Sequence, residues 1–383
     1  MNIENSIFLK ALNKEKLSTP PIWYMRQAGR YMPEYRAVRK NFKNFLDMCK
    51  NPEVCCELAL QPINAFNLDA AILFSDILTI PDALGLGVKF LEGEGPVFDN
   101  PIKISKDVIN LPDFEPDNLS YVYKAVSNIK NALPKNIPLI GFSGSPWTLA
   151  AYSIEGRSSK NFEYTKSFIR NNEEEAHIFL QKLTDACFIY LKKQVEAGAD
   201  VIQIFDSWAN LLSKKDYETY SLNYIRSLIS KLKEDQVTAS IPIILFAREP
   251  EISCNHMVKV QADCLSLYWK TKDIDLAFLN GKVALQGNLN PEILLQEDNV
   301  IKNEADRIAQ TIESVEGLVD EIIVIFSGST DGTQDLVKEL GCKLYYNKWH
   351  GFGPQKRFGE DRARNKWLLN LDADEYLSNE LKA

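Results

Sequence analysis

Short apolar runs that end abruptly in polar residues recur along most of the chain, and most are separated by stretches with helical periodicity. A continuous apolar run is typical of a strand buried on both faces of a parallel sheet. Eight such runs can be recognised, at residues 22–24, 69–76, 137–145, 199–208, 241–249, 262–269, 282–288 and 320–329. We find no internal repeat and no low-complexity linker between them.

The clearest helix is predicted between residues 172 and 197. Its apolar side chains trace one helical face, at Ala176, Phe179, Leu180, Leu183, Cys187, Tyr190 and Leu191. Acidic residues at its start, lysines near its end and Gly198 just beyond agree with the helix dipole and with the glycine preference after a helix. A second helix is predicted after Asn51, a good N-cap, with Pro52 in its first turn.

Eight buried strands alternating with helices predict an α/β fold, a (β/α)8 TIM barrel. An open Rossmann-like sheet is the alternative, but no GxGxxG follows the first strand. The active site of such a barrel is built at the carboxyl ends of its strands. The side chains predicted to lie there are Arg26, Asp76, Ser145, Ser207 and Gln286.

Composition narrows the function classes. The chain has 383 residues, 45% of them hydrophobic, and a net charge of -8 with pI near 5.2. An acidic surface argues against nucleic acid as a general partner, so any anion binding must be local. Seven cysteines without metal-ligand spacing predict free thiols, and no apolar run approaches membrane-spanning length. The N-terminus lacks the apolar core of a signal peptide, so we expect a cytoplasmic protein.

The sequence PIWYMRQAGRYMPEYR, residues 21–36, brings three arginines into one loop, at 26, 30 and 36. Gly29 and Pro33 prevent one regular element from running through it. Guanidinium groups grip carboxylates through two parallel hydrogen bonds, so the loop suits an anionic ligand. The alternative is that the arginines pair with acids of the protein itself, such as Glu34.

Asp76 ends an apolar run, and we expect its carboxylate to project from a wall of apolar side chains into the cleft. The alternative is a structural role, in which Asp76 caps the next helix or pairs with an arginine of the loop.

Several motifs resemble the uroporphyrinogen decarboxylase family over roughly residues 7–308. The motifs are MRQAGRY (25–31), FSDIL (74–78), GSPWTLAAY (144–152), FDSW (205–208) and KVALQGNLNP (282–291). The resemblance implies removal of the acetate carboxyl groups of uroporphyrinogen III to give coproporphyrinogen III in haem biosynthesis. It also implies that no cofactor is needed and that the enzyme is a homodimer.

The resemblance assigns roles to individual residues. Arg26 and Arg30 would bind substrate carboxylates. Asp76 would accept several pyrrole N–H bonds and centre the macrocycle while a ring is protonated. The remaining substrate-binding residues implied are Gln27, Tyr152, Phe205 and Ser207.

The chain departs from this family at strand ends and near its C-terminus. Arg248 and Glu249 stand where a lysine and a glycine are usual, and Tyr268 stands where an aspartate is usual. The family's final NLGHG-like turn, with its histidine, has no counterpart, which predicts weakened activity.

Residues 303–381 instead resemble the family 2 glycosyltransferases that extend lipopolysaccharide core, through NEADRIAQTIESVEGLVDEIIVIFSGSTDGT, KLYYNKWHGFGPQK and LLNLDADE. That resemblance implies a GT-A-like fragment in which Asp372 and Asp374 are weak candidates for a divalent-metal site. We therefore expect a barrel in residues 1–302 and a truncated transferase-like segment in 303–383, whose first strand, within 320–326, completes the barrel. The alternatives left open are a nucleotide-sugar-dependent glycosyltransferase and an inactive hybrid.

Overall fold

The computed structural model describes most of the N-terminal three quarters of the chain and parts of the remainder. The described residues are 3–17, 19–25, 27–91, 95–249, 254–271, 279, 281–287, 319, 321–327, 334, 337, 338, 340–348 and 352–364. The chain divides into two compact units, residues 1–288 and 289–383.

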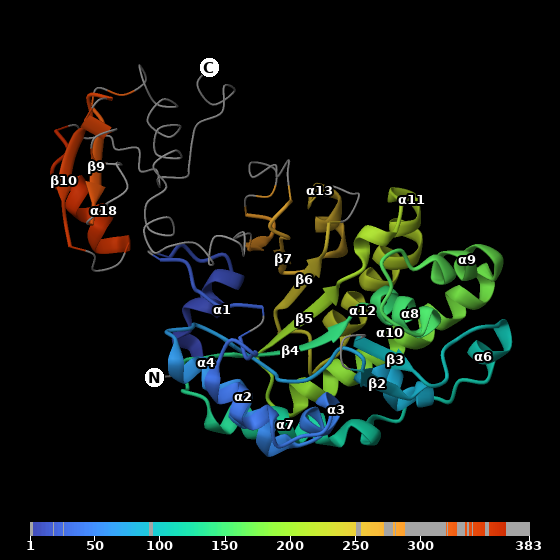
Figure 1. Cartoon of the computed structure of the whole chain (residues 1–383). Coiled ribbons are helices and arrows are strands. Elements are labelled where there is room, and N and C mark those ends of the chain that lie inside the picture. Colours follow the sequence, from blue (N-terminus) through green and yellow to red (C-terminus); the bar gives the residue numbers. More distant parts are fainter. Residues whose placement is uncertain are drawn as a thin grey trace. The chain divides into compact units, whose positions relative to one another are not determined.

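The first unit is built on a curled sheet of six parallel strands in the order β1-β4-β5-β6-β7-β8 (Figure 1). The strands are β1 (Ala71–Ile72), β4 (Leu139–Gly144), β5 (Val201–Asp206), β6 (Ile243–Ala247), β7 (Cys264–Ser266) and β8 (Ala284–Gln286). Sequential strands are neighbours throughout, as in a barrel, and the sheet forms a half-barrel. A separate antiparallel pair joins β2 (Val88–Leu91) to β3 (Gly95–Phe98).

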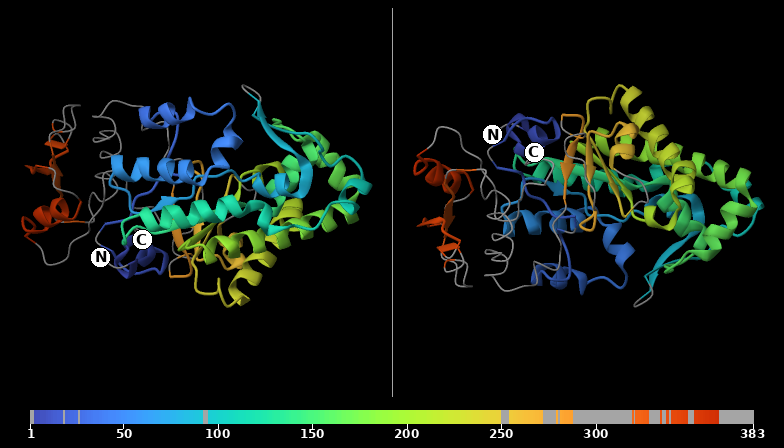
Figure 2. Two further views of the ribbon diagram at one scale, coloured as in Figure 1. Left: turned by 90° about the horizontal axis from the view of Figure 1, so that it is seen from below. Right: turned by 90° about the horizontal axis from the view of Figure 1, so that it is seen from above.

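Helices cover the outer side of this sheet, as views from below and above show (Figure 2). The α-helices of the unit are α1 (Ile7–Leu12), α2 (Pro33–Arg39), α3 (Phe45–Cys49), α4 (Pro52–Ala65), α5 (Thr79–Pro81), α6 (Ser105–Ile109), α7 (Ser120–Ala132), α8 (Pro146–Glu155), α9 (Glu163–Asn171), α10 (Glu173–Glu196), α11 (Lys214–Tyr217), α12 (Asn223–Glu234) and α13 (Cys254–Met257). The 3-10 turns are η1 (Ile3–Asn5), η3 (Pro116–Leu119), η4 (Ala209–Leu211) and η6 (Val258–Val260), and the π turns are η2 (Asp82–Leu86) and η5 (Glu218–Leu222).

The two helices predicted from sequence are confirmed as α10 and α4. All seven apolar residues of the predicted face of α10 are buried. Asn51 caps α4, because its side-chain oxygen accepts a hydrogen bond from the backbone N–H of Val54 at 3.1 Å. Both helices could therefore be predicted from local sequence signals alone.

The first predicted strand, residues 22–24, is wrong as a regular strand. One backbone bond links it to the chain leading into β1, from the Asp69 N–H to the Ile22 carbonyl at 2.8 Å. The Ile22 N–H is taken by the Asp69 side chain at 2.7 Å, so no ladder forms. The segment is nonetheless fixed beside β1, and Trp23 reaches β8, where its indole N–H donates to Gln286 at 2.7 Å.

Helix α1 packs against the amino-terminal end of the half-barrel. Phe8 and Leu12 of this helix form one buried cluster with the first inward side chains of the strands, which are Ala70, Ile140, Val201, Ile244 and Cys264. The cluster excludes water from this end of the sheet. Polar ligands are therefore restricted to the carboxyl ends of the strands.

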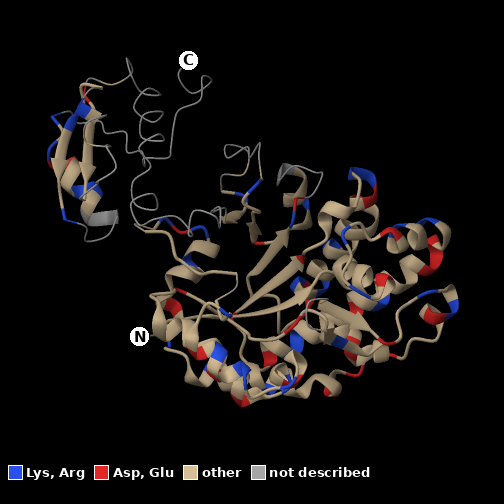
Figure 3. Cartoon of the chain, viewed as in Figure 1, with Lys and Arg blue, Asp and Glu red and all other residues tan. Residues whose placement is uncertain are grey.

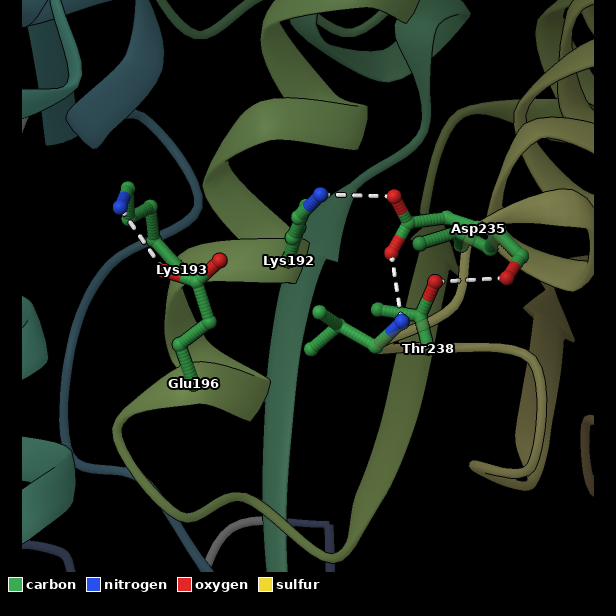
Figure 4. Close-up of polar contacts among 7 residues, drawn as sticks. Lys192, Lys193, Glu196, Asp235 and Thr238 are labelled. Carbon is green, nitrogen blue, oxygen red and sulfur yellow. Dashed lines mark hydrogen bonds and ion pairs between the residues drawn. The ribbon is translucent and has the colours of Figure 1, made fainter.

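Charged residues lie mainly on the helices and loops, and the strands carry few (Figure 3). Some ion pairs tie successive helices together. Lys192 of α10 binds Asp235, just after α12, at 2.7 Å, and the Asp235 carboxylate also accepts from the N–H of Val237 at 2.9 Å (Figure 4). The hydroxyl of Thr238 donates to the Leu232 carbonyl at 2.6 Å (Figure 4), and the Thr238 N–H donates to the Asp235 carbonyl at 3.2 Å. Lys193 pairs with Glu196 on the same helix at 2.8 Å. The contacts of Asp235 fix the start of the loop that leads from α12 into β6.

The second unit contains a parallel pair, β9 (Ile323–Phe326) and β10 (Lys343–Tyr346), and helix α18 (Phe352–Glu360). Lys343 and then Arg364 lower the pKa of Glu321 to about 2, and both donate to its carboxylate. We expected this first strand to complete the barrel. Among the described residues it pairs only with β10, a partner 20 residues further along its own segment.

No helix among the described residues is long and apolar enough to cross a membrane. The six cysteines whose side chains are described are all free thiols. Cys55 is buried and its neighbour Cys56 is only half-buried, since adjacent residues of a helix point to different faces.

Gln194 of α10 gives a test of how the helix layer holds the sheet. Its buried amide donates to the Phe142 carbonyl at 2.9 Å and accepts from the Phe142 N–H at 3.0 Å. Gln194→Leu leaves both backbone groups of β4 buried and unpaired, and should lower the free energy of unfolding by about 2–4 kcal/mol. Urea denaturation measures the change. The matched control is Gln181→Leu on the exposed face of the same helix, expected within about 0.5 kcal/mol of wild type; equal losses in the two variants would contradict this account.

Candidate active site

Polar residues gather at the carboxyl ends of the six strands, as the sequence predicts. Ser145 follows β4, Ser207 follows β5 and Gln286 is the last residue of β8. Gln286 donates to the hydroxyl of Ser266, the last residue of β7, at 2.9 Å and accepts from Trp23. This network holds the start of the arginine loop at the carboxyl ends of the strands. We call this end of the sheet the mouth of the half-barrel.

The arginine loop is anchored by two of its own side chains. Gln27 is buried, and its amide donates to the Ala70 carbonyl at 2.7 Å, just before β1. Arg36 donates to the carbonyls of Arg30 and Tyr31, at 2.8 and 3.1 Å, so its guanidinium group closes the loop. Gln27, a predicted substrate-binding residue, is thereby fixed by a hydrogen bond from its side chain to the backbone before β1.

Arg30 lies on the surface of this loop and forms no ion pair within the described part of the chain. Burial raises the pKa of Tyr35, and the nearby charges of Arg39 and Arg30 oppose that shift. Tyr35 in turn packs on Phe74, with ring centroids 6.1 Å apart. Arg30 is therefore close to Tyr35, which packs on Phe74, two residues before Asp76. Arg26 falls outside the described residues.

Asp76 lies four residues past the end of β1, at the start of the turn that leads into α5. Its Oδ1 accepts a hydrogen bond from the Leu78 N–H at 2.8 Å, so the structural alternative of a capping role holds for one oxygen. No described residue donates to the second oxygen. Burial raises the pKa of Asp76 to about 6, and the Leu78 bond opposes the rise. The group is a partly desolvated carboxylate with a free acceptor.

Three phenylalanines form a row across the inner face of neighbouring strands. Phe205 of β5 packs edge-on against Phe142 of β4 at 5.5 Å and against Phe246 of β6 at 6.0 Å between ring centroids. Edge-to-face contact is the preferred aromatic geometry. The row provides an apolar floor on which a flat, largely apolar ring can rest.

Tyr152 and Ser207 lie on the side of the mouth formed by β4, β5 and α8. The Tyr152 ring packs against Trp208 at 5.7 Å and against Phe162 at 5.9 Å. Ser207 is half-buried between Asp206 and Trp208, and its hydroxyl bonds to no other described residue. Tyr152 is thus placed against Trp208, the residue that follows Ser207.

Asp206 is a buried carboxylate whose importance sequence reasoning missed. It accepts hydrogen bonds from Ser145 at 2.7 Å, from Thr148 at 3.2 Å and from Ser221 of η5 at 2.7 Å. Burial raises its pKa, and these hydroxyl donors oppose the rise. The available signal was the carboxylate of FDSW at the end of a largely apolar run, which predicts a buried acid with hydrogen-bond donors around it. Asp206 fixes the ends of β4 and β5 and so positions Phe205 and Ser207.

No group of three or more potential metal ligands occurs among the described residues. Asp372 and Asp374, the weak candidates for a metal site, fall outside the described part of the chain.

The carboxyl ends of the strands in this parallel half-barrel carry an arginine loop, a partly desolvated carboxylate and a row of phenylalanines, in the place where enzymes built on a barrel have their active site. The family model described as uroporphyrinogen decarboxylase (URO-D) matches residues 4–320. The chain belongs to the uroporphyrinogen decarboxylase family. A second family model, glycosyl transferase family 2, matches residues 300–382.

Curated relatives agree with this family. Uroporphyrinogen decarboxylase from Acinetobacter baylyi is 48% identical over 294 residues, which cover 76% of this chain and 82% of the relative. The protein of the same name from Hydrogenovibrio crunogenus is 47% identical over 313 residues, covering 80% and 88%. A solved methyltransferase from Methanosarcina mazei matches with a TM-score of 0.63 and 20% identity over 84% of this chain and 91% of its own, and supports the fold alone.

The raised pKa of Asp76 predicts a pH dependence of stability. Because that pKa is about 6 in the folded chain and 3.8 in its ordinary state, the folded state binds a proton that the unfolded state releases in between. The resulting stability is present below about pH 4 and is lost as the pH rises through about 6. Asp76→Asn stays uncharged and keeps an acceptor for Leu78. Its free energy of unfolding should therefore increase relative to that of wild type as the pH rises from about 4 to about 6.

Urea denaturation at several pH values between 4 and 7 measures this difference. The control is Asp113→Asn on the surface, whose curve should run parallel to that of wild type. A parallel curve for Asp76→Asn as well would show that Asp76 is not desolvated.

Proposed function

We propose that this chain decarboxylates the four acetate arms of uroporphyrinogen III to give coproporphyrinogen III, without a metal or organic cofactor. The observation that carries the proposal is Asp76, a carboxylate at the mouth with one oxygen left to accept hydrogen bonds. A porphyrinogen presents several inward N–H groups at its centre and carboxylates around its edge. A central acceptor, an apolar floor and a cationic rim are complementary to that pattern.

The chemistry follows from the substrate. Protonation of a pyrrole carbon makes the ring an electron sink, so the bond between the acetate methylene and its carboxylate can break with loss of CO2. A proton then adds to the methylene to give a methyl group, and the ring proton returns to solvent, so each arm consumes one proton overall. Asp76 would stabilise the cationic ring by accepting its N–H bonds. Arg26 and Arg30 would hold carboxylates of the other arms, with Gln27, Tyr152, Phe205 and Ser207 completing the contacts.

The described histidines do not replace the family's C-terminal histidine. His177 bonds to Tyr224 at 2.6 Å, and His256 bonds to Glu218 at 2.8 Å, both through ring nitrogens. Proton delivery would then depend on water. We infer weaker turnover than an enzyme with a dedicated histidine achieves.

We further propose that residues 1–302 belong to a (β/α)8 barrel, that residues 303–383 form a GT-A-like fragment, and that the chain forms a cytoplasmic homodimer. The supporting observations are the six sequential parallel strands, the match of residues 300–382 to glycosyl transferase family 2 and the free thiols.

Two variants separate binding from chemistry. Arg30→Ala removes a charge-assisted contact and should raise the Kd for the eight-carboxyl porphyrin uroporphyrin III about tenfold. Asp76→Asn should reduce kcat by about 100-fold or more with little change in Kd, because its contacts strengthen only as the ring becomes cationic. Anaerobic turnover and porphyrin fluorescence measure the two quantities.

Arg170→Ala, a surface change on α9 with the same loss of charge, is the control for both quantities. Wild-type turnover in Asp76→Asn would remove Asp76 from the mechanism, and unchanged affinity in Arg30→Ala would remove Arg30 from the site.

A further inference from the structure

Arg248 is a cation at the mouth of the half-barrel that the proposed contacts above do not use. It directly follows β6, and its backbone N–H donates to the Asp206 carbonyl at 3.1 Å, which extends the pairing with β5 by one residue. The side chain is half-buried. Its backbone is therefore fixed at the carboxyl ends of the central strands.

The Arg248 guanidinium group lies between two aromatic rings. Its Cζ is 5.9 Å from the centre of the Trp208 ring and 5.7 Å from that of Tyr268, which follows β7. No ion pair of Arg248 with a carboxylate occurs in the part of the chain that the structure describes. Two ring faces orient a guanidinium group but do not satisfy its N–H donors.

Two buried donors at this place have no acceptor among the described residues. They are Nε of Arg248 and Nε1 of Trp208. Both groups can only donate hydrogen bonds, so whatever satisfies them must be an acceptor. A buried donor left unpaired costs about 1–3 kcal/mol, so two such donors on residues whose side chains are in contact favour a bound acceptor.

The Trp208 ring is held rigidly enough to define such a site. It packs on Phe162 at 4.5 Å and on Tyr152 at 5.7 Å. Its backbone carbonyl accepts from the indole of Trp147 at 2.9 Å. A bound group would therefore meet a preformed pair of donors rather than having to order them.

The sheet order separates this place from Asp76. Asp76 follows β1, whereas Arg248 follows β6, with β4 and β5 between them. A ligand that reaches both must extend across the row of Phe142, Phe205 and Phe246. A tetrapyrrole centred on Asp76 carries its carboxylate arms outward in this direction.

We propose that Arg248 and Trp208 form a second carboxylate subsite, distinct from the arginine loop, which binds an arm of the tetrapyrrole that is not reacting. The inference rests on the proposed function, because it takes the same substrate. It assigns specificity to a pair of residues that follow β5 and β6. The class of ligand recognised is a flexible alkyl carboxylate attached to a planar apolar ring.

The test measures the affinity of the full chain for uroporphyrin III, which keeps all eight carboxylates and is not turned over. Arg248→Gln should raise the Kd about tenfold at low ionic strength, and less as salt is added. Trp208→Phe keeps the ring but removes its N–H donor, and should raise the Kd about threefold to tenfold. Arg248→Lys keeps the charge without the planar fork and should fall between Arg248→Gln and wild type.

Arg170→Gln on α9 is the matched control, since it removes one surface positive charge remote from the mouth in sequence and element. It should leave the Kd within about twofold of wild type, as expected for a screened charge. A thermal melt checks each variant, and Trp208→Phe and Arg248→Lys carry the test if Arg248→Gln does not fold.

The outcomes separate this inference from the proposed function. If wild type binds uroporphyrin III and Arg248→Gln and Trp208→Phe bind it equally well, the subsite is wrong, water satisfies the two donors, and the proposed function stands. If Arg170→Gln loses as much affinity as Arg248→Gln, the effect is one of net charge and the subsite is again wrong. If wild type itself does not bind, the proposed function fails first.

Discussion

The mouth of the half-barrel depends on the hydrogen bonds that the buried carboxylate of Asp206 accepts. Three hydroxyl groups donate to it, two from the start of α8 and one from the π turn η5. Its own backbone carbonyl accepts from Arg248 after β6. A buried charge without such partners would cost several kcal/mol, so these elements hold their positions together. Phe205, Ser207 and Trp208 are aimed by this one arrangement, because they flank Asp206 in sequence.

A net charge of -8 repels a polyanionic ligand at long range. Long-range attraction is unfavourable, so affinity has to come from short-range, partly desolvated cations. Arg30, exposed on the loop after residues 22–24, and Arg248, half-buried after β6, provide positive charge at short range from separate elements. The apolar row between them would contribute by burying the ring rather than by charge.

Much of the fold could be predicted from the sequence, because buried parallel strands and capped helices leave local signals. The apolar face of α10 and the cap at Asn51 are examples. The segment at residues 22–24 could not be assigned correctly, since an isolated apolar triplet does not reveal whether its backbone finds a ladder or a side chain such as Asp69. The pairing of β9 with β10 was missed because any short β-branched run fits a sheet edge equally well.

The candidate site was predicted less completely than the fold. Motifs located Asp76, Gln27 and Ser207, but the division of Asp76 between a capping oxygen and a free one depends on tertiary geometry. The two unpaired donors of Trp208 and Arg248 also escaped prediction, because a lost partner is visible only when every neighbour is placed.

Anaerobic incubation of the purified chain with uroporphyrinogen III, followed by separation of the products by carboxyl number, tests the central claim most directly. Our account predicts products with seven, six, five and finally four carboxyl groups, formed without added metal and undiminished by a chelator. Recovery of the eight-carboxyl substrate alone, from a folded chain that binds it, would contradict the claim that this mouth performs decarboxylation.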